Sequence, residues 1–144
     1  MISAGNFVIE NPLKPVITVT IGNTENRKVV SALIDTGAMR SFISSKYAAE
    51  LNLEKVGTSM FAGSTSTKSK KTSLYNVNIQ FPFNYVFENV LVGEAMGLIA
   101  KDYDFVIGMD IISYGDMLIT NTDGKMMISL RFPSANERQL FPKY

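Results

Sequence analysis

The segment Val29-Val30-Ser31-Ala32-Leu33-Ile34-Asp35-Thr36-Gly37-Ala38 is the most informative part of this 144-residue chain. A mostly apolar run with β-branched residues predicts a buried strand, and here the run ends at an aspartate on a glycine-containing turn. Because burying a carboxylate costs free energy, an acid in such a place usually has a chemical role. Asp35 is therefore the first candidate for a catalytic residue.

The composition narrows the chemistry that this chain can perform. It contains no His and no Cys, which excludes Ser-His-Asp triads, Cys-His pairs, thiolate chemistry and the usual zinc sites. We therefore expect no metal and no cofactor. The lack of cysteine also excludes a disulfide framework and fits a cytoplasmic protein, or a domain released from a larger precursor.

The charge pattern gives little reason to expect nucleic acid or a membrane as a partner. The net charge is +1, and the one basic cluster, Lys68-Ser69-Lys70-Lys71, lies in a Ser/Thr-rich stretch that predicts a solvated loop. No apolar run approaches the ~20 residues of a membrane span, and the first residues lack the pattern of a secretory signal. The length predicts one domain over residues 1–144, with a polar tail at 133–144.

Short strands separated by turns dominate the rest of the sequence. Hairpins are predicted for 16–21 with 28–34, and for 117–120 with 126–130 around Asp123-Gly124. Further strands are predicted at 7–9, 75–81, 85–92 and 105–108, and short helices at 45–53 and 109–114. This pattern indicates an all-β, barrel-like domain with one or two short helices.

Residues 56–74 are mostly small and polar, and two large apolar residues stand at what should be an exposed tip. The stretch is either a long loop without regular structure or a hairpin that closes over a ligand and touches it with apolar side chains. The Asp-Thr-Gly motif favours the second interpretation. The candidate flap residues are Met60, Phe61, Ala62, Gly63 and Ser64.

A second motif, Val106-Ile107-Gly108 followed by Met109-Asp110-Ile111-Ile112, stands near the end of the chain. Together with Ala32-Leu33-Ile34-Asp35-Thr36-Gly37-Ala38 and the hairpin tip between them, it resembles the retropepsin-like aspartic proteases of bacteria, phages and transposons. The resemblance covers approximately residues 14–131. It implies a closed acid-protease-like β-barrel with a flap hairpin, and an aspartic endopeptidase activity.

Carboxylate-catalysed peptide hydrolysis needs two acids, one to deprotonate water and one to polarise the carbonyl. Two carboxylates about 3 Å apart share one proton and titrate as a pair. The chain has one Asp-Thr-Gly motif, so the resemblance implies a twofold homodimer in which Asp35 of each subunit meets at the axis. Asp110, at the start of a predicted helix, is expected to serve only as a helix-terminus partner.

The resemblance also suggests roles for the neighbouring residues. The Thr36 hydroxyl would bridge backbone groups beneath the acid pair, and the Gly37 carbonyl would accept a hydrogen bond from the peptide substrate. Ala38 cannot donate a hydrogen bond to the acids, which predicts a mildly acidic pH optimum. Gly108 would pass close under the Asp35 loop. Val106 and Ile107 are either walls of the substrate cleft or ordinary core residues.

Three residues depart from the retroviral pattern. Met39 and Arg40 replace acidic residues, and Met109 replaces the arginine that often pairs with them. Because both ends of that ion pair are missing, the region could pack through apolar contacts, and Arg40 could favour an acidic substrate residue. In the family, terminal strands join the subunits, and the candidates here are residues 7–9 and 126–130.

Three other interpretations are open from the sequence. The domain could be a catalytically silent, retropepsin-fold module that binds peptides or dimerises, or a structural protein in which Asp-Thr-Gly occurs by chance. A Ser-Lys hydrolase is disfavoured because no Ser lies three residues before any Lys.

Overall fold

A computed structural model describes residues 1–61, 70–95 and 102–135 of the chain. Within these ranges it contains ten strands and two short helices, in the order β1 (Ser3–Ile9), β2 (Val16–Gly22), β3 (Arg27–Ile34), β4 (Phe42–Ser44), α1 (Ser45–Glu50), β5 (Lys55–Phe61), β6 (Lys70–Phe81), β7 (Tyr85–Ala95), β8 (Phe105–Ile107), α2 (Met109–Ile112), β9 (Asp116–Thr122) and β10 (Lys125–Phe132).

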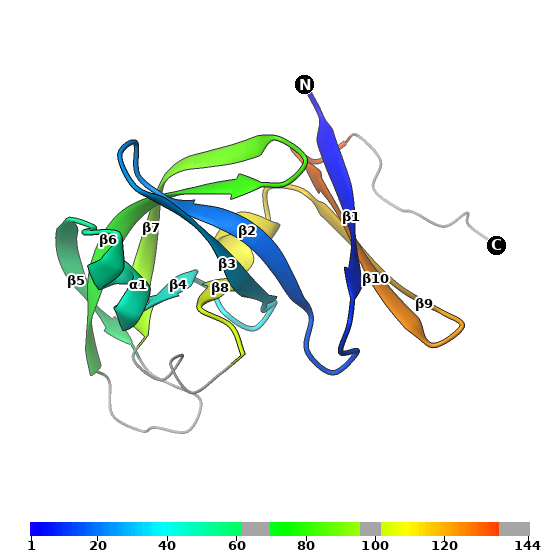
Figure 1. Ribbon diagram of the computed structural model, residues 1–144, viewed down its shortest axis with the longest axis horizontal. Helices are drawn as coiled ribbons and strands as arrows, with labels where there is room; N and C mark the ends of the chain where they lie inside the picture. The colour runs from blue at the N-terminus through cyan, green and yellow to red at the C-terminus, as the bar shows by residue number, and fades with distance from the viewer. Residues whose placement is uncertain (62–69, 96–101, 136–144) are drawn as a thin grey trace.

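Six of these strands close into a barrel (Figure 1). Their order is β2-β3-β8-β4-β7-β6, and pairing of β2 with β6 completes the ring, while β5 extends the sheet beyond β6. Two of the pairings, β3 with β8 and β4 with β7, are parallel. The predicted all-β, closed-barrel fold is confirmed.

Alternating side chains explain why these segments fold as a barrel. In β2, Ile17, Val19 and Ile21 are buried, whereas Thr18 lies on the exposed face. This period of two places one apolar face inside the barrel. The core also receives apolar residues from β3, β6, β7 and β8 and from both helices.

The predicted hairpins form, and their turns show why. Asp123 and Gly124 both have positive φ angles, 52° and 74°, as a tight two-residue hairpin turn requires. At the turn between β2 and β3, the Asn23 side chain accepts hydrogen bonds from the backbone N–H groups of Glu25 and Asn26. Helix α1 begins after Ser44, whose hydroxyl accepts a hydrogen bond from the Tyr47 N–H.

Several boundaries differ from those predicted. Strand β1 begins at Ser3, β4 was not predicted, and α2 ends at Ile112, two residues early. Lys70 and Lys71 were expected in a loop but begin β6, because antiparallel pairing with Phe61 and Met60 extends that strand. Lys68 and Ser69 lie outside the described residues.

A second, three-stranded sheet in the order β1-β10-β9 stands beside the barrel (Figure 1). Phe132 of β10 is 1% exposed, and its ring lies within 6.2 Å of the ring centroids of Phe81, Phe83, Tyr85 and Phe87. Aromatic pairs in such tilted and edge-on arrangements stabilise beyond their buried area. This aromatic cluster joins the small sheet to the tip of the β6–β7 hairpin.

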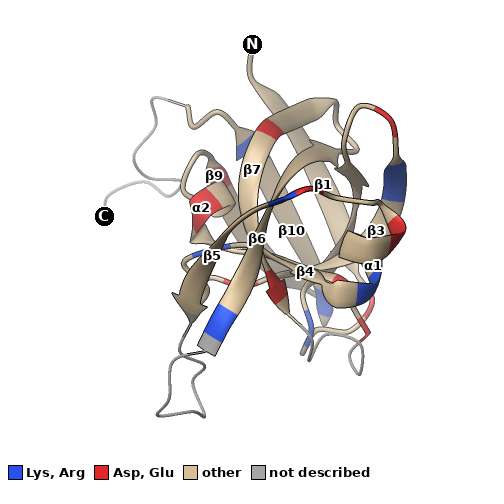
Figure 2. Ribbon diagram, turned by 90° about the vertical axis from the view of Figure 1, so that its left-hand side faces the viewer, with Lys and Arg blue, Asp and Glu red and all other residues tan. Residues whose placement is uncertain are grey.

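Charges of both signs are mixed on the side of the described residues that Figure 2 shows. Figure 2 shows acidic and basic positions interspersed over the viewed face, which agrees with the net charge of +1.

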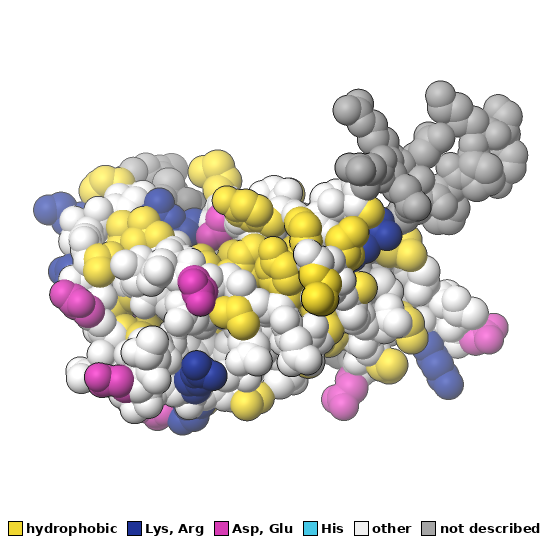
Figure 3. Space-filling model, turned by 90° about the horizontal axis from the view of Figure 1, so that it is seen from above, with side chains coloured by type: hydrophobic (Ala, Val, Ile, Leu, Met, Phe, Trp, Pro, Cys, Tyr) yellow, Lys and Arg dark blue, Asp and Glu magenta, His cyan; other side chains and the backbone are white. Residues whose placement is uncertain are grey.

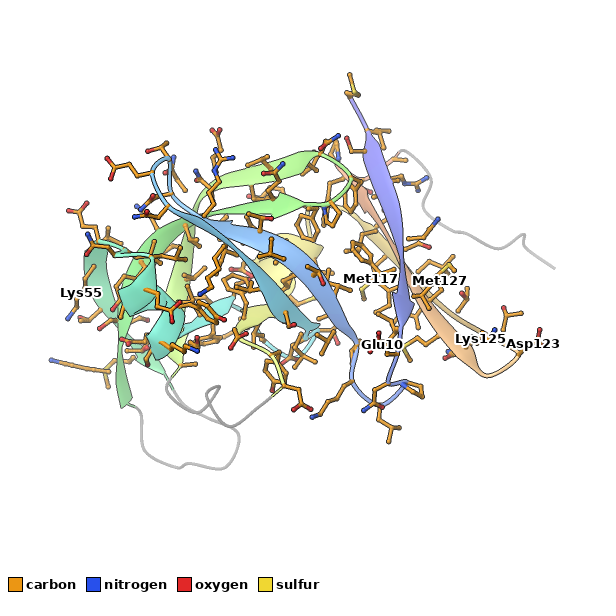
Figure 4. All side chains as sticks on the ribbon, viewed as in Figure 1. Glu10, Lys55, Met117, Asp123, Lys125 and Met127 are labelled. Atoms are coloured by element: carbon orange, nitrogen blue, oxygen red, sulfur yellow. The ribbon has the colours of Figure 1, made fainter. Side chains whose placement is uncertain are left out.

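Apolar side chains gather across the middle of the upper face (Figure 3). The β9–β10 hairpin, marked by Asp123 and Lys125, extends away from the barrel (Figure 4). In the part of the chain that the structure describes, no helix is long and apolar enough to cross a membrane.

Candidate active site

The barrel brings the two sequence motifs side by side. Parallel pairing of β3 with β8 places Ile34 opposite Ile107. The Asp35 N–H then donates a hydrogen bond to the Ile107 carbonyl at 3.0 Å. Asp35 therefore follows the end of one central strand and is held in place by its neighbour.

The residues after Asp35 form a tight turn. The Gly37 N–H donates to Oδ1 of Asp35 at 2.9 Å, and the Ala38 N–H donates to the Asp35 carbonyl at 3.2 Å. The Asp35 side chain is partly exposed, and Thr36 and Gly37 are exposed at the tip of the turn. The turn thus exposes Thr36 and Gly37, and partly exposes Asp35, on the outside of a single chain.

Gly108 lies directly beneath this turn. A Cβ atom at position 108 would come within 2.8 Å of the Ala38 carbonyl oxygen and of the Arg40 backbone, and the Met109 N–H donates to the Ala38 carbonyl at 2.7 Å. Because φ of Gly108 is −94°, any L-residue could adopt its backbone conformation. The position requires glycine because of the close approach of two backbone segments.

The two residues before Gly108 have different surroundings. Ile107 is 1% exposed and belongs to the main hydrophobic core. Val106 is 7% exposed, lies outside that core cluster, and is paired with Leu33 on one side and Phe42 on the other. Ile107 is therefore a core residue, and Val106 is a buried residue outside the main core cluster.

The candidate flap is described only at its start. Met60 lies near the end of β5, pairs with Lys71 and is 61% exposed, and β5 ends at Phe61. Ala62, Gly63 and Ser64 lie outside the described residues.

Behind the turn, the structure shows a polar network that sequence reasoning missed. Ser41 is fully buried, its N–H donates to Oδ2 of Asp110 at 2.9 Å, and its hydroxyl donates to Oδ1 at 2.8 Å. The Gly108 N–H donates to the same hydroxyl at 3.0 Å. Asp110 accepts a hydrogen bond from the Ile111 N–H at the start of α2, as expected of an acid at a helix terminus. It also binds Ser41, which the sequence did not predict. No spacing signal links Ser41 to Asp110, because the contact depends on barrel closure.

In the single chain, the apolar packing that this region could adopt does not include Met39. Met39 is 89% exposed and Met109 is 37% exposed. Arg40 is half-buried. The Ser41–Asp110 network, rather than apolar contact, attaches this part of the loop to the barrel. Among the described residues, no group of three or more His, Cys, Asp or Glu side chains could hold a metal ion.

Comparison with known proteins agrees with this geometry. Residues 17–114 match the model of the gag-polyprotein putative aspartyl protease family. The fold is similar to that of a retropepsin-like aspartic protease from Rickettsia conorii, with a TM-score of 0.57, 16% identity, and coverage of 92% of this chain and 96% of that chain. No curated protein is significantly similar in sequence.

Two further solved structures are more distantly similar. The EIAV protease, crystallised with an inhibitor, gives a TM-score of 0.49 at 19% identity, covering 73% of this chain and 90% of that one. The retroviral protease-like domain of Ddi1 from Leishmania major gives 0.46 at 15% identity, covering 85% and 97%.

The barrel, the Asp-Thr-Gly turn and the matched residues define a retropepsin-like protein. The chain belongs to the gag-polyprotein putative aspartyl protease family.

Proposed function

We propose that this protein is an aspartic endopeptidase whose catalytic acid is Asp35. The observation that carries the proposal is a partly exposed carboxylate on a turn that is hydrogen-bonded to β8 and lies against Gly108, in a chain of an aspartyl protease family. In the reaction, an ionised carboxylate takes a proton from water, the water oxygen attacks the peptide carbonyl, and a second, protonated carboxyl polarises the carbonyl oxygen. The tetrahedral intermediate then breaks its C–N bond, the leaving nitrogen takes the proton that came from water, and the acid pair again holds one proton.

The second carboxyl would come from another copy of the chain. There is one Asp-Thr-Gly motif in the sequence, and in the single chain its turn is exposed at Thr36 and Gly37. A twofold axis beside this turn would bring two copies of Asp35 to about 3 Å, where like charge prevents both from ionising and the pair retains one proton. The Thr36 hydroxyl would then contact the partner's turn.

The small sheet limits how two copies could join. The sequence candidates for the joining strands, residues 7–9 and 126–130, pair with each other within one chain, with Phe7 opposite Ile128. Strand β10 already has a neighbour on both sides, whereas β1 and β9 are the edge strands of the sheet as the structure describes it. An edge strand offers unpaired backbone groups, so a second copy would join at β1 or β9 and not at β10.

A peptide substrate would bind as an extended strand. The Gly37 carbonyl on one side and the flap hairpin of β5 and β6 on the other would provide backbone hydrogen bonds. Val106 and Met60 would contact side chains of the substrate, and Arg40 would favour an acidic residue. The main-chain hydrogen bonds would provide affinity for the peptide, and these side chains would determine which substrate sequences are preferred.

The test compares Asp35→Asn with Asp123→Asn. Asp123 lies at the β9–β10 turn with a positive φ of 52°, which Asn tolerates, so the control carries the same chemical change far from the site. We expect the wild type and Asp123→Asn to cleave a casein-type substrate at mildly acidic pH, and Asp35→Asn to lose at least about 10³-fold in kcat. Titration with pepstatin should give one inhibitor per two chains.

The same variants test the alternative, a silent peptide-binding or dimerisation module. In such a module the Asp35 charge has no use, so Asp35→Asn should raise the melting temperature with no activity to lose. Absence of proteolysis and of pepstatin binding between about pH 3 and pH 7, at concentrations where sedimentation shows a dimer, would refute the proposed protease.

A further inference from the structure

Ser41 is an unusually well-connected buried residue. It is one of two buried polar side chains among the described residues, and all of its polar groups are used. Its N–H and hydroxyl donate to Asp110, its hydroxyl oxygen accepts from the Gly108 N–H, and its carbonyl accepts from the Gly93 N–H of β7 at 3.0 Å. Ser41 thus links the end of the catalytic loop to two separate parts of the chain, β7 and the start of α2.

Asp110 is the charged partner in this network. Both of its carboxylate oxygens accept hydrogen bonds, Oδ2 from the Ser41 N–H at 2.9 Å, and Oδ1 from the Ser41 hydroxyl at 2.8 Å and the Ile111 N–H at 3.0 Å. Hydrogen bonds to an ionised acceptor are roughly twice as strong as neutral ones. A two-point contact of this kind also fixes direction, so the carboxylate restrains both the position and the orientation of Ser41.

These bonds complete a set of restraints on the loop that carries Asp35. At its start, the Asp35 N–H is bound to the Ile107 carbonyl, and in the middle the Ala38 carbonyl is bound by the Met109 N–H. Between Ala38 and Ser41 there is no buried apolar side chain, because Met39 is exposed and Arg40 is half-buried. The far end of the loop is therefore held by the hydrogen bonds of Ser41, in which Asp110 provides the only charged partner and the only side-chain partner among the described residues.

We propose that Asp110 is a positioning residue that acts through Ser41 to hold the Asp35 loop in the geometry needed for catalysis. The inference rests on the proposed protease function. Two carboxylates that must meet at about 3 Å tolerate little movement, and a displacement near 1 Å can cost about 10²-fold in rate. Asp110 itself touches no substrate and no reacting atom, so its effect should fall on kcat.

The kinetic test uses Asp110→Ala, Ser41→Ala and the double variant. We expect each single variant to lower kcat by about 10- to 100-fold, while KM changes by less than about threefold, because substrate contacts from the flap hairpin are retained. Since the two side chains act as one unit, the double variant should be no slower than the slower single variant. Asp110→Asn retains one acceptor oxygen and the side-chain volume, so it should recover part of kcat.

The matched control is Asn23→Ala. Asn23 also accepts two backbone N–H groups with one side chain, but it lies at the turn between β2 and β3, at the opposite end of β3 from Asp35. Its loss should lower the melting temperature and leave kcat within about twofold of the wild type. Equal losses of kcat in Asn23→Ala and Asp110→Ala would overturn the proposal, because the effect would then follow stability alone.

Hydrogen exchange provides a readout that does not need activity. Asp110→Asn, the variant expected to fold even if Asp110→Ala does not, should speed exchange of the Gly37, Ala38 and Met109 amides and leave the β2–β3 hairpin unchanged. If the wild type proves inactive, the proposed function fails, and the exchange rates still decide whether Asp110 holds the loop. Unchanged exchange at all three amides would overturn the inference.

Discussion

Replacement of Gly108 by alanine isolates the steric contact between the two sequence motifs. The new Cβ atom would lie 2.8 Å from the Ala38 carbonyl oxygen and 2.8 Å from the Arg40 carbonyl oxygen, whereas ordinary contacts begin at 3.4 Å. One backbone segment must therefore move by about 0.6 Å, because backbone atoms cannot rotate away as a flexible side chain can. The φ of −94° is accessible to alanine, so the effect contains no conformational penalty.

The magnitude of this effect follows from two general relations. Overpacking a rigid site costs about 1–3 kcal/mol, which for a chain of this size lowers Tm by about 3–10 °C. The segment that must move carries Asp35, so a displacement of half an ångström or more should lower kcat by about 10- to 100-fold. Activity should therefore fall further than stability alone explains.

Thermal unfolding and peptide hydrolysis at one pH measure the two effects. The stability control is Gly57→Ala in β5, where the nearest atom to a new Cβ is the Leu74 Cδ1 at 3.9 Å, so Tm should stay within about 2 °C of the wild type. If Gly108→Ala has the Tm of the control and full kcat, the loop does not depend on this contact and the reasoning is wrong.

Two further predictions concern pH. Ala38→Ser adds a hydrogen-bond donor beside the acid pair, and this donor stabilises the ionised form of the pair. The pH optimum of kcat/KM should therefore move down by about one pH unit. An unchanged pH profile, or a wild-type optimum below about pH 3, would contradict this prediction. Hydrogen bonds from Ser134 and Ala135, together with Arg131, hold the pKa of Asp116 below its usual 3.8. Its stabilising contribution is complete above that value and is lost as pH falls through the folded-state pKa. Asp116→Asn should therefore lower Tm at pH 6, and this deficit should shrink as the pH falls below 3.8. A deficit in Tm that does not vary with pH would contradict the prediction.

The sequence was sufficient for features that neighbouring residues encode. Apolar and β-branched runs, some with alternating polar residues, identified five of the six barrel strands, all except β4. Asp123-Gly124 identified a turn in which both residues adopt positive φ. The Asp-Thr-Gly motif after an apolar strand located Asp35, and its position at the end of β3 follows from that pattern. These features depend on the conformations of a few adjacent residues, so they can be recognised without the rest of the molecule.

The tertiary structure decided which distant segments meet. The pairing of β3 with β8, the three-residue strand β4, the pairing of β1 with β10 and the contact between Ser41 and Asp110 join parts of the chain that have no common local signal. Their free energy comes from closing the barrel and burying its core, to which many residues contribute small amounts. For that reason Asp110 looked in the sequence like an ordinary helix-terminal acid, and only the closed barrel placed it against the buried Ser41.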